Sequence, residues 1–266
     1  IYNRTREKAQ PLESEGAVWC DTPAKVAENS SVIFSIVGFP GDVEEVILGP
    51  EGALTTAAKG SVIVDMTTSE PVLADTIAEK ASQKGILCLD APVSGGDLGA
   101  REGKLAIMVG GDKSAYDRVL PLFQIMGENI AYMGPAGAGQ HTKMSNQILI
   151  ASTMIGVIES LLYAYKAGLD LDEVIDVIGK GAASSWSINT LGRRIVKGDF
   201  DPGFYIKHFI KDMGIALDEA RRMNLSLPGL ALANQFYIAA SALGFENLGT
   251  QGLYKVFEQM NAVTRS

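Results

Sequence analysis

Lys143 and Asn146 are the residues in this sequence most suited to acid–base chemistry. In the stretch "GAGQHTKMSNQ", residues 137–147, they stand three residues apart, so a helix would bring both side chains to one face, with Gln147 alongside. A lysine in the first turn of a helix is opposed by the helix dipole, and this field, together with partial burial, favours loss of its proton. Such a lysine suits general acid–base catalysis. The alternative is a solvated lysine that tolerates a small electrostatic cost, and the amide one turn away favours the catalytic interpretation.

The stretch "DAPVSGGDLGAREGK", residues 90–104, suggests an anion-binding loop. A predicted strand runs into Pro92 and then into Ser94, Gly95 and Gly96. Glycines permit positive φ angles and close approach of a ligand, and successive N–H groups can form a nest for a carboxylate, to which the Ser94 hydroxyl adds a donor. The alternative is a mobile glycine-rich connection, and spacing alone leaves the two interpretations even.

Other candidate residues stand at the ends of predicted strands, where open α/β sheets bind their ligands. Phe39 and Pro40 follow one strand, and Thr68 follows the next. Each could contact a cofactor. Each could equally belong to the start of a helix, and Ser69 is a good N-cap for the helix that follows it.

Asn3, Arg4 and Thr5 follow two apolar residues that look like the end of a strand. At the end of the second strand of a dinucleotide-binding domain, an acidic residue would accept a hydrogen bond from the ribose 2′-hydroxyl, whereas an arginine would meet a 2′-phosphate. The absence of an acid here favours NADP over NAD. The alternative is an ordinary helix start with Arg4 in solvent.

Lys211 and Asp212 interrupt an otherwise apolar helical pattern in "KHFIKDMGIALDEA", residues 207–220. Taken alone, the pair is best interpreted as an ion pair on the surface. Nothing in the spacing of this pair assigns it a catalytic role.

The elements that must position these residues alternate between short β-branched runs and helical patterns as far as residue 133. Such alternation predicts crossover units and a largely parallel sheet of the Rossmann type, with residues 104–109 as an antiparallel strand at one edge. The expected strands are 18–20, 32–37, 61–66, 86–90, 104–109 and 129–133, and the expected helices between them are 22–29, 42–48, 70–84 and 113–126.

Helical patterns alone follow the turn "GPAGAGQ", and they predict an all-α domain. We place the domains at residues 1–135 and 136–266. The expected helices of the second domain are 140–167, 171–179, 187–197, 207–223, 230–243 and 252–261.

A dinucleotide-binding domain opens with a strand, a glycine-rich turn and a helix, a unit of about 30 residues. Ile1 and Tyr2 correspond to the second strand, so we expect the opening unit, with its G-x-G-x-x-G turn, to lie upstream of Ile1.

Composition excludes several classes of function. A net charge of −8 argues against nucleic-acid and anionic-membrane partners. The two histidines lie far apart in sequence, which makes a metal site improbable, and the two cysteines, expected as buried thiols, indicate a reducing cytoplasm. The longest apolar stretch, residues 148–162, carries polar residues that argue against a plain membrane span, and the first residues do not resemble a signal peptide.

Three motifs in this order, "DAPVSGG", "GAGQHTKMSNQ" and "KDMGIALDEA", resemble the β-hydroxyacid dehydrogenase family. That family includes 3-hydroxyisobutyrate dehydrogenase, tartronate semialdehyde reductase and glyoxylate/succinic semialdehyde reductase, and the similarity covers essentially the whole chain. The stretches "DAPVSGGDLGAREGKLAIMVGGD" and "KGDFDPGF" are most similar to the tartronate semialdehyde reductase branch.

The resemblance implies an NADP- or NAD-dependent oxidoreductase that interconverts a small hydroxyacid and its semialdehyde, and that forms a homodimer or homotetramer. It assigns Lys143 as the catalytic acid–base. It implies substrate contacts from Ser94, Gly95, Gly96, Asn146, Gln147 and Asp212. It implies cofactor contacts from Asn3, Arg4, Thr5, Phe39, Pro40, Thr68 and Lys211.

Three alternatives stay open at this point. Imine reductases share the fold but typically lack the catalytic lysine, so Lys143 argues against them. A 6-phosphogluconate dehydrogenase would have a much longer C-terminal half. A non-catalytic Rossmann scaffold that only oligomerises would lack the glycine-rich turn, and the residues upstream of Ile1 distinguish it from the enzyme.

Overall fold

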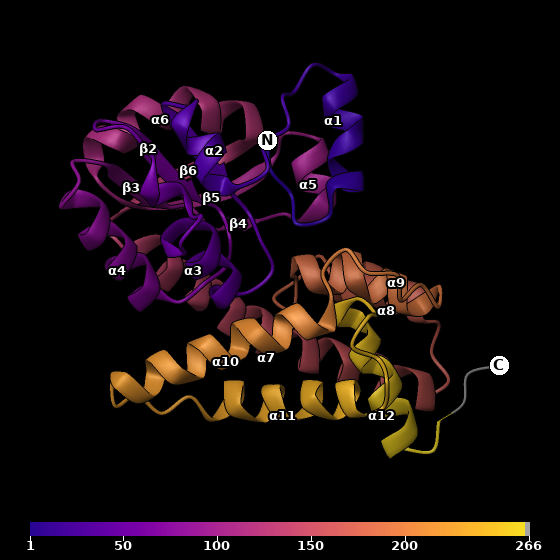
Figure 1. Cartoon of the computed structure of the whole chain (residues 1–266). Helices are drawn as coiled ribbons and strands as arrows, with labels where there is room; N and C mark the ends of the chain where they lie inside the picture. Colours follow the sequence, from indigo (N-terminus) through magenta and orange to yellow (C-terminus); the bar gives the residue numbers. More distant parts are fainter. Residues whose placement is uncertain (264–266) are drawn as a thin grey trace. The chain divides into compact units, whose positions relative to one another are not determined.

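The computed structural model describes residues 1–263, in two compact units (Figure 1). The first unit is Ile1–Lys143 and the second begins at Met144. This division falls inside helix α7 (Ala138–Lys166), later than the expected boundary after residue 135. The reason is that the first residues of α7 pack with the sheet, whereas the rest of the helix belongs to the core of the second unit.

The first unit contains a six-stranded mixed sheet. Its first three strands are parallel neighbours in register, with Val32 opposite Val62 and Val62 opposite Leu87. The fifth strand runs antiparallel to the third and fourth and parallel to the sixth. The strands are β1 (Val32–Ser35), β2 (Val62–Asp65), β3 (Leu87–Asp90), β4 (Val93–Ser94), β5 (Leu105–Gly111) and β6 (Gly127–Gly134).

Helices of the first unit start at residues that favour a helix N-terminus. Proline occupies the first helical position of α2, α3 and α4, where its missing N–H is not needed. Asp112 caps α6 by accepting a hydrogen bond from the Ala115 N–H at 2.9 Å. The helical segments are η1 (Arg6–Ala9), α1 (Gln10–Ser14), α2 (Pro23–Glu28), α3 (Pro40–Leu48), η2 (Ala53–Thr55), α4 (Pro71–Ser82), α5 (Gly96–Arg101) and α6 (Lys113–Met126).

Strand β2 is buried on both faces. Val62 and Val64 belong to a cluster with Phe123 of α6, whereas Ile63 belongs to a second cluster with Ile47 of α3. Helices therefore cover both faces of the sheet, which explains why the sequence of β2 is apolar throughout rather than alternating.

The second unit is helical. Buried residues of α7, among them Met154 and Ile158, pack with Phe209 and Tyr237 in one cluster. Helices α10 and α11 lie side by side (Figure 1). The segments after α7 are α8 (Leu171–Ile178), the short π-helix η3 (Ser187–Gly192), α9 (Arg193–Val196), α10 (Ile206–Arg222), α11 (Pro228–Ala242), η4 (Thr250–Leu253) and α12 (Tyr254–Met260).

Helix α7 is long and apolar enough to cross a membrane by length and composition alone. The central helix of a folded globule meets the same criterion. The buried side chains of α7 form the core of the second unit, which accounts for its apolar composition without a bilayer.

Three expectations about the elements were wrong. Residues 18–20 do not form a strand; they are extended and pair only with the chain start, through the Cys20 N–H and Ile1 O. Cys20 is half-buried rather than buried. Strand β5 is antiparallel to β3 as expected, but it lies inside the sheet, because β6 pairs with its other side.

Candidate active site

Asp90, at the end of β3, anchors the start of α7. Its Oδ1 accepts a hydrogen bond from the Gly137 N–H and its Oδ2 accepts one from the Gln140 N–H, both at 2.9 Å. These N–H groups belong to the helix N-terminus and have no partner within the helix itself. The carboxylate therefore caps the helix that carries Lys143.

Gln140 ties the same helix turn to the loop after β2. Its Nε2 donates to Thr67 O at 2.7 Å, and its Oε1 accepts from the Ser69 N–H at 2.9 Å. Ser69 was expected to cap α4 but does not: Glu70 is the N-cap, and the buried Ser69 Oγ has no hydrogen-bond partner among residues 1–263. The start of α7 is thus fixed to the carboxyl ends of both β2 and β3.

Lys143 is buried, with 6% of its surface exposed. Because α7 begins at Ala138, earlier than expected, Lys143 lies in the second turn rather than the first. The turn at Gly137, with φ +79°, and the external cap from Asp90 let the small residues before Gln140 join the helix. The opposing effect of the helix dipole on Lys143 is weaker there than the sequence indicates.

One turn further along α7, hydrogen bonds between polar side chains connect this helix to α10. Asn146 Nδ2 donates to Gln147 Oε1 at 2.8 Å, Gln147 Nε2 donates to Asp212 Oδ2 at 2.6 Å, and Lys211 Nζ lies 2.9 Å from Asp212 Oδ1. Gln147 and Asp212 are buried, at 1% and 0% exposure. The Lys211–Asp212 pair is largely buried, with 12% and 1% of the two side chains exposed, and is not the surface pair that the sequence pattern predicted.

The loop Ser94–Gly96 begins where β4 ends. Gly95 and Gly96 both have positive φ, +131° and +64°, and a Cβ on Gly95 would lie 3.3 Å from Leu105 Cδ2. Both glycines are exposed, and Gly96 starts the short helix α5, which the sequence pattern did not predict. Two consecutive residues with positive φ make a tight turn at the end of β4, and they leave the backbone without side chains where a ligand could approach.

Comparison with known proteins identifies the family. Residues 1–134 match the family model described as the NAD binding domain of 6-phosphogluconate dehydrogenase. Residues 137–257 match the family model described as "NAD-binding of NADP-dependent 3-hydroxyisobutyrate dehydrogenase". This chain belongs to the β-hydroxyacid dehydrogenase family. It is an NAD(P)-dependent hydroxyacid dehydrogenase, and its first unit is an NAD(P)-binding domain.

Individual relatives agree with this assignment. The oxidoreductase YkwC of Bacillus subtilis is 53% identical, over 97% of this chain and 89% of its own. The 2-hydroxy-3-oxopropionate reductase of Escherichia coli is 40% identical, over 95% of this chain and 86% of its own. The solved structure of Psf3 in complex with NADP+ and 2-OPP has a TM-score of 0.88 and 26% identity, over 96% of this chain and 90% of that one.

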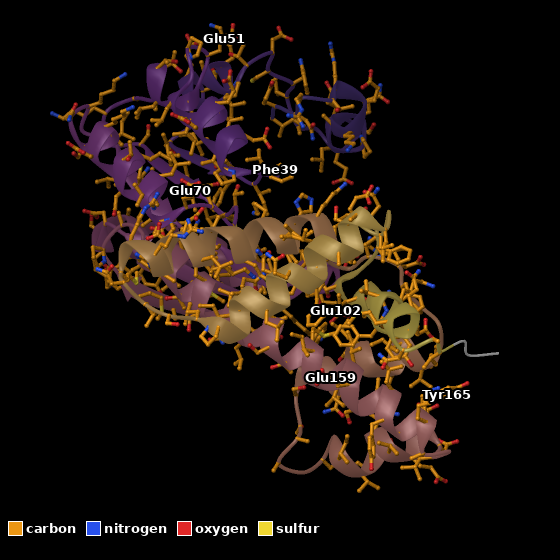
Figure 2. The ribbon with its side chains drawn as sticks, turned by 90° about the horizontal axis from the view of Figure 1, so that it is seen from below. Phe39, Glu51, Glu70, Glu102, Glu159 and Tyr165 are labelled. Carbon is orange, nitrogen blue, oxygen red and sulfur yellow. The ribbon has the colours of Figure 1, made fainter. Side chains whose placement is uncertain are left out.

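Of the expected cofactor residues, Phe39, Pro40 and Thr68 follow the carboxyl ends of the parallel strands β1 and β2, whereas Lys211 lies on α10 of the second unit. The Val37 N–H donates to Thr67 Oγ1 at 2.9 Å, which joins the loops after β1 and β2. In the first of these loops Ile36 and Phe39 stay exposed, Phe39 at 43% (Figure 2), while Thr68 is half-buried. Apolar side chains left exposed at this edge fit the flat rings of a dinucleotide.

The Asn3–Thr5 segment forms a turn and presents Arg4 to solvent. Asn3 Oδ1 accepts from the Thr5 N–H at 3.0 Å, and the guanidinium of Arg4, 83% exposed, lies 3.1 Å from Asp42 Oδ1. Asp42 also accepts from the Phe39 N–H at the start of α3. The arginine is therefore held next to Phe39 and the first turn of α3, where a 2′-phosphate could reach it.

Sequence analysis missed Asp65, Asp90 and Gln140 as parts of the site. Asp65 and Asp90 are opposite each other on β2 and β3, and both are buried. The available signal was the pair of apolar strands "VIVD" and "LCLD", each ending in an aspartate that should have favoured solvent. Within residues 1–263, no cluster of three or more His, Cys, Asp or Glu side chains could hold a metal ion.

Proposed function

We propose that this dehydrogenase interconverts a small β-hydroxyacid and its semialdehyde, with Lys143 as the acid–base group and the Ser94–Gly96 loop as the seat of the substrate carboxylate. The observation that carries the proposal is that Asp90 is close to both groups: it precedes the Ser94–Gly96 loop in the chain, and it is hydrogen-bonded to the helix that contains Lys143. Ser94 lies four residues after Asp90, a span of at most about 14 Å of extended chain. Lys143 lies three residues after Gln140, whose N–H Asp90 accepts, or about 4.5 Å along the helix.

A bound nicotinamide cofactor supplies the hydride in reduction or accepts it in oxidation. We assign Phe39, Pro40 and Thr68 to hold it, because they stand at the carboxyl edge of β1 and β2. Arg4 favours NADP, since a guanidinium pairs well with a 2′-phosphate. The cofactor contact of Lys211 stays a prediction that rests on the family resemblance.

Lys143 would act on the oxygen of the reacting carbon. As an ammonium it donates a proton to the carbonyl oxygen as negative charge develops there; in the reverse direction the amine takes the hydroxyl proton. Burial of Lys143 strengthens this interaction, because charges interact more strongly where water is excluded. Ser94 and the two glycines would orient the carboxylate, so that the carbonyl is presented in one direction.

Asn146 would anchor the substrate, and Gln147 and Asp212 would hold Asn146 and Lys211 in place. Both ends of the Gln147 amide are engaged, one with Asn146 and one with Asp212. The direct substrate contacts predicted for Gln147 and Asp212 remain predictions, and the burial of both residues favours a supporting role.

The test is a panel of tartronate semialdehyde, methylmalonate semialdehyde, succinate semialdehyde and glyoxylate, each with NADPH and NADH. The full-length protein is compared with its Lys143→Ala variant by following the absorbance of the reduced cofactor. We expect turnover of at least one aldehyde by the wild type and a loss of about 10²–10⁴-fold in kcat in the variant. Tartronate semialdehyde is the predicted preferred substrate.

Lys166→Ala is the matched control, because Lys166 is an exposed lysine at the other end of α7. It should leave kcat unchanged. NADPH binding, followed by cofactor fluorescence, should survive in both variants. Normal turnover by Lys143→Ala would refute the mechanism, and a wild type that reduces none of the four aldehydes would refute the substrate class.

A further inference from the structure

Asp90 differs from an ordinary helix cap because both of its oxygens are used and it is buried. Its two acceptor contacts, to the N–H groups of Gly137 and Gln140, span the first turn of α7. The side chain of Gln140 adds two further hydrogen bonds, to the backbone of Thr67 and Ser69. Gly137 and Gln140 therefore hold the start of α7 to the ends of β2 and β3 by four hydrogen bonds.

Two glycines bring the helix close enough for these contacts. A Cβ on Gly110 of β5 would lie 2.5 Å from Asp90 Oδ1 and 2.7 Å from the Gly139 nitrogen. A Cβ on Gly139 would lie 2.5 Å from Asp90 O. Real Cβ atoms do not approach other atoms so closely. The start of α7 is therefore packed against β3 and β5 with no space for a side chain at either glycine.

We propose that Asp90 is a positioning residue for catalysis: by holding the start of α7 against the end of β3, it fixes Lys143 relative to the Ser94–Gly96 loop, which follows four residues later along the chain, at the end of β4. This inference rests on the proposed function of Lys143. Asp90 does not touch the substrate in this scheme. It acts through the helix, by setting where Lys143 stands.

The electrostatic setting shows that Asp90 is not simply a stabilising group. Burial raises the pKa of Asp90 to about 7; the two α7 N–H groups act in the opposite direction, and the nearby Asp65 adds to the rise. The titratable groups around it are Asp65 on β2, Cys88 on β3 and Asp75 on α4, the last close to Gly137. A charged carboxylate is thus disfavoured here, and a neutral residue of the same shape would avoid that cost.

The test compares Asp90→Asn with Asp112→Asn in the same aldehyde assay. Asp112 caps α6 of the same unit in a similar way, but α6 carries no residue of the proposed site. The amide of Asp90→Asn keeps one acceptor oxygen. Its NH2 group faces the N–H of either Gly137 or Gln140, and because two donors repel, the start of α7 should shift. We expect kcat to fall about ten- to a hundredfold with the KM for NADPH within about twofold of wild type, and Asp112→Asn to keep its kcat.

Two further readouts separate positioning from a general loss of structure. In Asp90→Asn, the amide hydrogens of Gly137 and Gln140 should exchange faster, while that of Ala115, at the start of α6 capped by Asp112, keeps its rate. In the wild type, kcat for reduction should decline below about pH 7 as Asp90 takes up a proton, whereas a lysine acid alone would stay active there; the variant should lose this decline.

The possible failures are distinct. Wild-type kcat in Asp90→Asn, alongside an inactive Lys143→Ala, overturns the positioning role and leaves the proposed function standing. A drop in kcat with unchanged exchange at the start of α7 also overturns it, because the effect would not pass through the helix. An active Lys143→Ala overturns the proposed function, and with it the premise of this inference.

Discussion

Asp90 and Asp212 are both buried carboxylates that contact α7, but their partners differ. Asp90 accepts two backbone N–H groups at the start of the helix. Asp212 accepts from the Gln147 amide and lies 2.9 Å from the ammonium of Lys211. A full positive charge offsets the carboxylate of Asp212, whereas only dipoles offset that of Asp90. The comparison indicates that Asp212 is a stability element of the second unit, while Asp90 is sensitive to pH.

The largest effect is expected from breaking the Asp212 contacts. Asp212→Ala removes the carboxylate beside Lys211 and the buried acceptor of the Gln147 amide, which should lower the free energy of unfolding by about 3–5 kcal/mol. Urea unfolding measures this. Asp218→Ala, on the same helix, removes only an exposed pair with Arg221 and should have almost no effect. Equal effects of the two variants would show that burial does not set the strength of these pairs.

The next effect concerns pH and Asp90. Its pKa in the folded chain, about 7, exceeds the unfolded value of about 3.9. Between these values the folded state holds a proton that the unfolded state has lost, so stability falls as pH rises through this window and is flat above it. The contribution is on the order of a few kcal/mol across the window.

Asp90→Asn removes this titration. Urea unfolding of wild type and variant from about pH 5 to about pH 8 should show the variant gaining stability relative to wild type as pH rises. Carboxyl groups that do not interact with Asp90 cancel in the difference between the two curves. A difference that is flat with pH would show that Asp90 titrates normally, and would contradict the contrast with Asp212.

The sheet and most helices could be predicted from the sequence because their signals are local. Apolar runs such as "SVIVDM" predict buried strands, and the turn before Gln140 predicts the change from α/β to all-α structure. Lys143 could be singled out because its partner amide is one helical turn away. Such inferences need only the neighbouring residues.

The role of Asp90 could not be predicted in this way. Its partners, Gly137 and Gln140, lie far along the chain, and their approach depends on Gly110 of β5. The burial of Lys211 and Asp212 was missed for a similar reason. Helical periodicity says that they interrupt an apolar face, but not that Gln147 of α7 meets them there.

A smaller effect should follow from adding a side chain where the start of α7 packs against β5. Gly110→Ala adds a methyl group against Asp90 and Gly139, so the helix must shift, at a cost of about 1–3 kcal/mol in the free energy of unfolding and with a lower kcat. Gly156→Ala in α7 is the matched control, since its Cβ meets nothing within 4 Å; it should stabilise by about 0.4–1 kcal/mol. A fully active Gly110→Ala would show that Lys143 tolerates a displacement of α7. The positioning role that separates Asp90 from Asp212 would then lose its support.

The smallest effect on stability is expected at Arg4. Its ion pair with Asp42 is at the surface, unlike the contacts of Asp90 and Asp212. The Arg4–Asp42 pair is exposed on the arginine side, so Arg4→Ala should leave the melting temperature nearly unchanged. It should nevertheless raise the KM for NADPH about tenfold or more, because a charged hydrogen bond to the 2′-phosphate is lost, and leave the KM for NADH as it is. Arg6→Ala serves as the control: its guanidinium lies over the ring of Trp19, 5.1 Å from the ring centre, and it should change neither KM. Equal KM changes for the two cofactors in Arg4→Ala would contradict the NADP preference, since only NADP carries the phosphate that Arg4 is proposed to bind.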